Sequence, residues 1–220
     1  MRRTITLLLI LLIGSGVAVA QNAGGETDSV IRGRYRLSLD LTLAPGANDF
    51  APRAMQLAVV NSLSWGKYLS GAVGIGLRHS YVLTAIDENI YGYGEEDQLT
   101  YSDRLLLPFF VRVKGVVPVG RFAWMGTGFT PYAQLSLGYA VDMQQSARER
   151  TVSGVFMEPA LGLDMRLNSG NYWSLTTGVG FQGAQYRVVD HHGEADPAAA
   201  TVEMKTGNAV SINFGIAYIF

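Results

Sequence analysis

Residues 132–143 have the sequence YAQLSLGYAVDM, in which apolar side chains alternate with small or polar ones at nearly every step. Every second residue from Ala133 to Met143 is apolar. Successive side chains of a β-strand point to opposite faces of a sheet, so this period of two predicts a strand with one apolar face. The same pattern recurs along the chain, and it decides the fold.

Eight segments share this alternation. We expect strands near residues 34–43, 55–63, 69–81, 104–114, 132–143, 155–167, 173–182 and 210–220. The connections are expected at 44–53, 64–67, 84–103, 116–129, 146–152, 168–171 and 188–207. Most of the connections at one end are short turns, and those at the other end are longer, which is typical of an outer-membrane barrel. The predicted fold is therefore all-β, an up-and-down antiparallel eight-stranded transmembrane β-barrel.

The composition limits the function classes. The chain has 220 residues, of which 48% are hydrophobic and 16% charged, with 26 glycines and no cysteine. This length fits a single domain. The absence of cysteine excludes a disulfide framework, a cysteine-ligated zinc site and a thiol nucleophile.

The first twenty residues have the features of a cleaved signal peptide. Arg2 and Arg3 precede an apolar run, and Ala18 and Ala20 form a small-x-small cleavage site. We therefore divide the chain into a signal peptide at 1–20, a short N-terminal segment at 21–30 and a barrel at 31–220. The mature chain is slightly acidic, so no basic excess suggests nucleic acid as a partner.

The face opposite the apolar one indicates which side is the interior. Its members are often glycine or alanine, which weaken a strand on a solvent-exposed face. The lumen of an eight-stranded barrel is only just wide enough for side chains, so small residues are useful there. We therefore expect the apolar face to contact lipid and the following small residues to point inward: Gly74, Gly76, Gly138, Ala140, Gly162, Gly178, Gly180, Ala184, Gly215 and Ala217.

The inward face also carries charges of both signs. An isolated charge in a tight interior is costly, so these residues are expected to pair into a salt-bridge plug rather than to select ions. The predicted lumen charge network contains Arg34, Arg36, Asp40, Arg78, Arg104, Arg112, Lys114, Asp142, Glu158, Asp164 and Arg166.

Aromatic residues gather near both sets of strand ends, as in an interfacial belt. One group contains Trp65, Tyr68, Trp124, Phe129, Tyr132, Tyr172, Trp173, Tyr218 and Phe220. The other group contains Tyr81, Tyr101 and Tyr139.

Residues 213–220, NFGIAYIF, end the chain on Phe with apolar or aromatic residues at alternate positions before it. This segment resembles the outer-membrane β-signal. The mature chain as a whole is similar to small eight-stranded outer-membrane β-barrels, the OmpA-, OmpX- and OmpW-like barrels and those common in Bacteroidetes-type bacteria. The resemblance implies a Gram-negative outer membrane, contact with its lipid and lipopolysaccharide, and recognition by the barrel-assembly machinery. The implied assembly signal is Phe214, Ile216, Tyr218 and Phe220.

Candidates for catalysis or metal binding are weak. His79 and Ser80 are adjacent, whereas barrel-embedded lipid A deacylases place a His and a Ser two residues apart on one face. The segment 190–196 contains His191 and His192 beside carboxylates, and the 84–103 connection is acidic, but both are typical of solvated loops. We predict no catalytic residue, no metal site and no cofactor.

The sequence thus predicts a monomeric integral outer-membrane barrel, not an enzyme, with a largely plugged lumen and a structural or surface-interaction role. A passive small-solute channel of the porin type is the alternative, and a lipid A-modifying enzyme is a weaker one. A soluble periplasmic sandwich remains the alternative fold.

Overall fold

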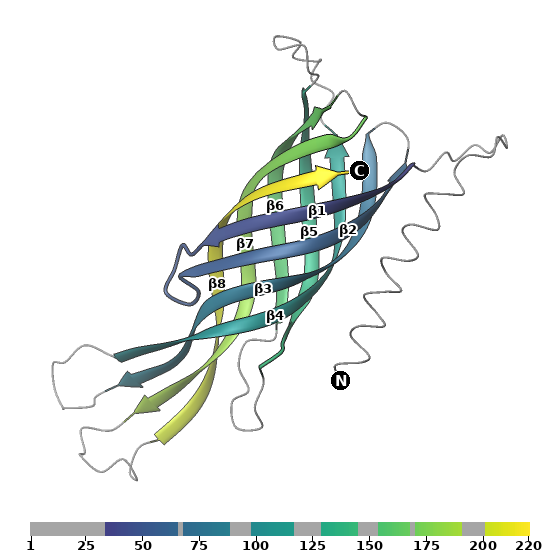
Figure 1. The fold of residues 1–220 in the computed structure, drawn as a ribbon. Coiled ribbons are helices and arrows are strands. Elements are labelled where there is room, and N and C mark those ends of the chain that lie inside the picture. The colour runs from purple at the N-terminus through teal and green to yellow at the C-terminus, as the bar shows by residue number, and fades with distance from the viewer. Residues whose placement is uncertain are drawn as a thin grey trace.

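The computed structural model describes residues 34–65, 68–88, 98–116, 129–144, 154–167, 170–190 and 201–220. They form eight strands in one closed barrel, in which each strand is antiparallel to its neighbours in the chain (Figure 1). No helix in these ranges is long and apolar enough to cross a membrane. The strands are β1 (Arg34–Pro45), β2 (Arg53–Trp65), β3 (Leu69–Glu88), β4 (Gln98–Val116), β5 (Phe129–Asp142), β6 (Gly154–Arg166), β7 (Tyr172–Asp190) and β8 (Thr201–Ile219).

The barrel closes where the first strand meets the last. β1 and β8 pair antiparallel from Ser38 opposite Ile219 to Leu43 opposite Phe214. The Phe220 backbone N–H adds a hydrogen bond to the Leu37 carbonyl oxygen, at 2.9 Å. This closure leaves no unpaired edge in the ring, which confirms the predicted up-and-down barrel.

The apolar face points outward, as the alternation predicts. Leu161 is 63% exposed and Val111 54% exposed, whereas the intervening inward positions are mostly buried. A broad band of exposed Leu, Val, Ile, Met and Phe surrounds the barrel, and this is the surface that a membrane barrel presents to lipid. We call this band the apolar girdle.

The two ends of the barrel differ. At the turn end lie the start of β1, the tight turn between β6 and β7, and Phe220. Gly170 in that turn has a φ of 88°, in the left-handed region that favours glycine. At the loop end, β3 and β4 and β7 and β8 extend as two long hairpins beyond the other strands (Figure 1).

These extensions were not predicted as strands. The sequence placed connections at 84–103 and 188–207, but β3 and β4 remain paired as far as Asp87 and Gln98, and β7 and β8 as far as Asp190 and Thr201. Thr201 to Thr206 are all exposed. Strands that protrude beyond the girdle need no apolar face, so the hydrophobic pattern does not reveal them.

Inward glycines make room for large inward aromatic rings. A Cβ at Gly74 would overlap the ring of Phe110, and one at Gly162 would overlap the ring of Tyr132. A Cβ at Gly138 would lie 2.7 Å from the ring of Phe156. The small residues of the inward face therefore match large side chains from neighbouring strands, which fill the lumen.

We expect Gly74→Ala to destabilise the barrel, because the new methyl group overlaps the Phe110 ring. Forcing extra volume into a packed interior costs about 1–3 kcal/mol. Urea unfolding in detergent micelles measures the free energy of unfolding. Gly115→Ala on β4 is the matched control, since its Cβ meets nothing within 4 Å. Equal effects of the two substitutions would contradict the packing described here.

Candidate functional site: the lumen

Four ion pairs between described residues lie in the lumen at successive levels: three join strands that are not neighbours, and Arg104–Asp142 joins the adjacent strands β4 and β5. Counting from the turn end they are Lys114–Asp164, Arg112–Asp40, Arg78–Glu158 and Arg104–Asp142. Three of the four cations come from inward positions of β4, and Arg78 of β3 pairs in register with Leu106, between them. The structure thus brings together opposite charges that lie far apart in the sequence.

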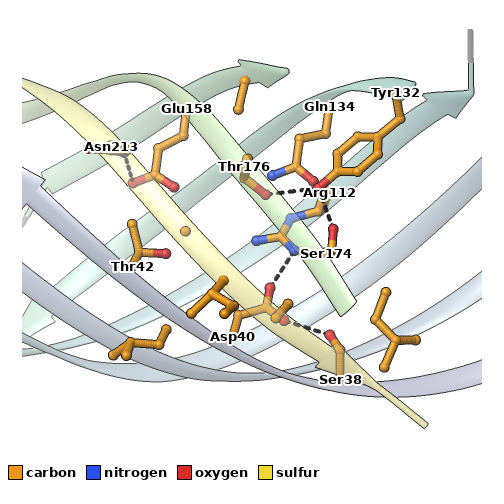
Figure 2. A pocket seen from close by; sticks show the side chains of 16 residues that line it. Ser38, Asp40, Thr42, Arg112, Tyr132, Gln134, Glu158, Ser174, Thr176 and Asn213 are labelled. Atoms are coloured by element: carbon orange, nitrogen blue, oxygen red, sulfur yellow. Dashed lines mark hydrogen bonds and ion pairs between the residues drawn. The ribbon is translucent and has the colours of Figure 1, made fainter. Parts of the chain in front are cut away.

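The Arg112–Asp40 pair crosses the middle of the barrel (Figure 2). Arg112 Nη1 donates to Asp40 Oδ2 at 2.6 Å, and Arg112 Nε donates to Ser136 Oγ at 3.0 Å. Ser38 Oγ donates to the other carboxylate oxygen of Asp40 at 2.7 Å. Hydrogen bonds beyond the ion pair offset part of the cost of removing both charges from water.

The Lys114–Asp164 pair lies nearest the turn end. Lys114 Nζ donates to both carboxylate oxygens of Asp164, at 2.8 and 2.6 Å, and lies 3.6 Å from the centre of the Tyr132 ring. Ser174 Oγ also donates to Asp164, at 2.8 Å, and is 2.6 Å from the Tyr132 hydroxyl. A carboxylate, an ammonium group and an aromatic ring therefore form one bonded cluster across this level.

The two remaining pairs lie toward the loop end. Arg78 Nη1 is 3.3 Å from Glu158 Oε1, which also accepts a hydrogen bond from Asn213 Nδ2 at 3.0 Å. Arg104 Nη1 is 3.8 Å from Asp142 Oδ2, and both side chains are almost fully buried. The lumen thus holds charges of both signs in balanced pairs, without an excess of either along the four levels.

An apolar layer separates these polar levels. Phe110 and Phe156 meet edge to face with ring centroids 6.1 Å apart, and Arg112 lies 5.2 Å from the Phe110 ring centre. Leu106 and Val82 belong to the same cluster, and each is at most 2% exposed. These apolar side chains therefore occupy part of the lumen in addition to the ion pairs.

The loop end is narrowed by a pairing across the ring. β3 and β7 stand on opposite sides of an eight-stranded barrel, yet their ends pair parallel from Ala85 opposite Arg187 to Glu88 opposite Asp190. Paired strands lie only about 4.8 Å apart, so this contact draws the two walls together. The β1–β2 connection packs below it, where the Phe50 carbonyl oxygen accepts a hydrogen bond from Leu83 N–H.

A small cavity lies between polar side chains of the lumen (Figure 2). Its volume is about 50 Å³, and its lining includes Asp40, Thr42, Arg112, Glu158 and Thr176. A single water requires roughly 10–15 Å³ measured in this way, so the space holds a few waters and no larger solute.

Other members of the predicted charge network lie nearer the turn end. Arg36 donates to the Tyr172 hydroxyl at 3.3 Å and lies 4.3 Å from its ring centre. Arg166 is exposed at the end of β6 and makes no ion pair with a described residue. Arg34 begins β1 opposite Ser64.

The catalytic candidates His79 and Ser80 do not form a site. His79 points outward and lies 3.3 Å from the exposed Asp103, whereas Ser80 points inward, is buried and accepts a hydrogen bond from Arg78. Within the described ranges no group of three or more His, Cys, Asp or Glu could hold a metal ion. His191 and His192 lie outside those ranges.

The aromatic belt at the turn end needs two corrections, for Tyr132 and for Tyr172. Tyr172 takes an inward position of β7 beside Arg36, while Trp124 lies outside the described residues. Trp173, Tyr218 and Phe220 form an outward cluster, with ring centroids 5.0 and 4.8 Å apart along the series. Tyr132 does not belong to it: this residue is 2% exposed and occupies an inward position of β5. Tyr132 is near the start of β5 in the sequence, but the alternation of side chains points it into the lumen and not toward the lipid.

The partners of the charges are mostly uncharged residues that the sequence analysis did not single out. Ser38, Ser136, Ser174, Thr176 and Asn213 all take inward positions that the alternation defines. Their position could therefore be predicted, but which charge each one contacts depends on the stagger between strands.

Comparison with known proteins supports the fold. No family model matches the chain, and neither does any curated protein sequence. The outer membrane protein OprG from Pseudomonas aeruginosa is similar in structure, with a TM-score of 0.54 and 13% identity over 84% of this chain and 95% of that one. AlkL matches with a TM-score of 0.41 and 12% identity, covering 89% of this chain and 94% of that one. A major outer membrane protein from Thermus thermophilus matches with a TM-score of 0.33 and 14% identity, covering 84% and 99%.

The likeness to OprG agrees with the strand order and the outward apolar girdle. The chain therefore has the fold of an eight-stranded outer-membrane β-barrel. This is the fold that the sequence predicts.

We expect Arg112→Met to cost about 3–5 kcal/mol of stability, because it leaves the Asp40 carboxylate buried without its cation. Adding Asp40→Leu should recover most of this loss, since the double variant buries no unpaired charge. Urea unfolding of the reconstituted barrel measures all three variants. Asp103→Asn is the control: it breaks the exposed His79–Asp103 pair and should change stability by less than about 1 kcal/mol. Additive losses in the double variant would contradict a buried, coupled pair.

Proposed function

We propose that this protein is a closed outer-membrane barrel, with a structural or surface-interaction role rather than a transport role. The observation that carries the proposal is the double obstruction of the lumen. The Arg112–Asp40 pair crosses it beside the contact between Phe110 and Phe156. The small volume of the remaining cavity and the β3–β7 pairing at the loop end support the same conclusion.

The part of the barrel available for a surface role is the pair of long hairpins. In an outer-membrane barrel the longer loops face the cell exterior. The exposed start of β8 includes Val202, 62% exposed, and Met204, 50% exposed. A closed barrel that presents rigid paired strands beyond the lipid is suited to display and contact, with lipid and lipopolysaccharide around its girdle.

Single-channel recording in planar bilayers tests the proposal. We expect no reproducible open steps from the wild-type barrel. A triple variant with Asp40→Ser, Arg112→Ser and Phe110→Ala should conduct, because it removes side chains from both the polar and the apolar obstruction. Heat-modifiable gel migration verifies that both proteins are folded. Regular steps from the wild type would refute the closed lumen and favour a passive small-solute channel.

We also propose that the end of β8 is the signal read by the barrel-assembly machinery. Phe214, Ile216 and Tyr218 take outward positions, and Phe220 follows with 59% of its surface exposed. Because the Phe220 side chain is so exposed, it contributes little to the packing of the barrel. It and the outward side chains before it can therefore be contacted by the assembly machinery.

Phe220→Ala should lower the amount of protein in the outer membrane while leaving spontaneous refolding into detergent nearly unchanged. The comparison separates recognition in the cell from intrinsic stability. Ile219→Ala is the control, because Ile219 lies between the alternate positions of the motif. A similar loss of refolding yield and cellular level in Phe220→Ala would show a packing role in place of a signal.

A further inference from the structure

The outer face of the barrel has a groove near the turn end, on strands β1 to β3. Most of its lining consists of outward positions, and its volume is about 350 Å³. Gly71 lines this outer groove beneath the Trp65 ring, because a Cβ at this position would lie 2.6 Å from the ring. Its other outward lining residues are Tyr35, Asn61, Leu63, Trp65 and Val73.

Asn61 is anomalous at this position. It points outward from β2, between its cross-strand neighbours Leu37 and Val73. Its side-chain amide makes no hydrogen bond with the described part of the chain. The described outward amides of β7 and β8, Gln185 and Asn208, are exposed toward the loop end, whereas Asn61 lies among apolar neighbours near the turn end. Thr177 on β7 is another outward polar side chain.

The depth of Asn61 places its amide among the acyl chains. Trp65 marks the level of the lipid headgroups, since aromatic side chains concentrate at that interface. Asn61 precedes Trp65 by four residues. At the rise per residue and tilt of a barrel strand, the two residues are separated by about 10 Å along the membrane normal. At that depth neither water nor lipid headgroups can form hydrogen bonds with the amide. A polar group without a hydrogen-bond partner in hydrocarbon is costly.

We propose that the outer groove is the contact surface for a second copy of this chain, with Asn61 pairing with Asn61 of the partner across a twofold axis. An amide carries both donors and an acceptor, so two copies related by a twofold can exchange two N–H···O bonds. Two barrels inserted in the same direction have their Asn61 amides at the same depth in the membrane. The two amides can therefore reach each other across the twofold axis.

The shape of the groove supports a protein partner. The Trp65 ring packs over Gly71 and forms one wall of the groove, a rigid aromatic surface against which a partner can pack. The exposed Tyr35 and Val73 on either side provide apolar contact around the amide pair. An acyl chain could fill the same volume, but it has no hydrogen-bonding group to offer Asn61. In this proposal a twofold dimer in the membrane replaces the monomer expected from the sequence.

The absence of cysteine from the chain allows a direct test by crosslinking. Val73→Cys, at the residue paired with Asn61 across β2 and β3, keeps the amide in place and in outer-membrane vesicles should give a covalent dimer with a short bismaleimide. Thr177→Cys, equally lipid-facing but on β7, should give little dimer at the same expression level. Equal yields from the two sites would indicate random collision and would overturn the proposal.

A second measurement follows the association of the barrels without a crosslinker. Barrels labelled with donor or acceptor dyes on Glu203→Cys, in the exposed start of β8, are mixed in phosphatidylethanolamine and phosphatidylglycerol vesicles. We expect energy transfer that falls at least tenfold when Asn61→Leu is added and is unchanged by Thr177→Leu. Wild-type energy transfer no higher than that of Asn61→Leu would overturn the dimer. So would native mass spectrometry showing a monomer that retains phospholipid only when Asn61 is present.

Discussion

An eight-stranded barrel has room inside only for its own side chains, and this limit governs the rest of the molecule. Charges placed there lose water and must find partners across the lumen. Rings placed there need a glycine on a neighbouring strand, as Phe110 needs Gly74. The apolar residues that would form a core in a soluble protein are displaced to the outside, where lipid takes the place of the core.

The fold could be predicted from the sequence because one periodicity carries it. In residues 132–143 the apolar and small faces are distinct, and the small face could only be an interior. The same alternation placed Ser80 inward and His79 outward, which the structure confirms. It did not reveal the ends of the long hairpins, because strands beyond the lipid obey no such alternation and can be polar on both faces.

The interior arrangement was predictable only as a set of residues. The sequence indicates that Asp40 and Arg112 share the lumen, but which charges meet depends on the tilt and stagger of strands that are distant in the chain. The pairing of β3 with β7 at the loop end is a similar case, since it arises between strands on opposite sides of the ring. For Tyr132 the direction of the side chain was predictable. The residue was nevertheless assigned to the aromatic belt because it lies near a strand end.

The central claim is that water and ions cannot pass through the lumen. Ala140 on β5 points inward, is 1% exposed and belongs to the apolar layer. The most direct measurement is the rate at which a charged, membrane-impermeant thiol reagent modifies Ala140→Cys from each side of a reconstituted membrane. The account predicts no modification from either side until the barrel is unfolded. Rapid modification from both sides would show a continuous aqueous path and would contradict it.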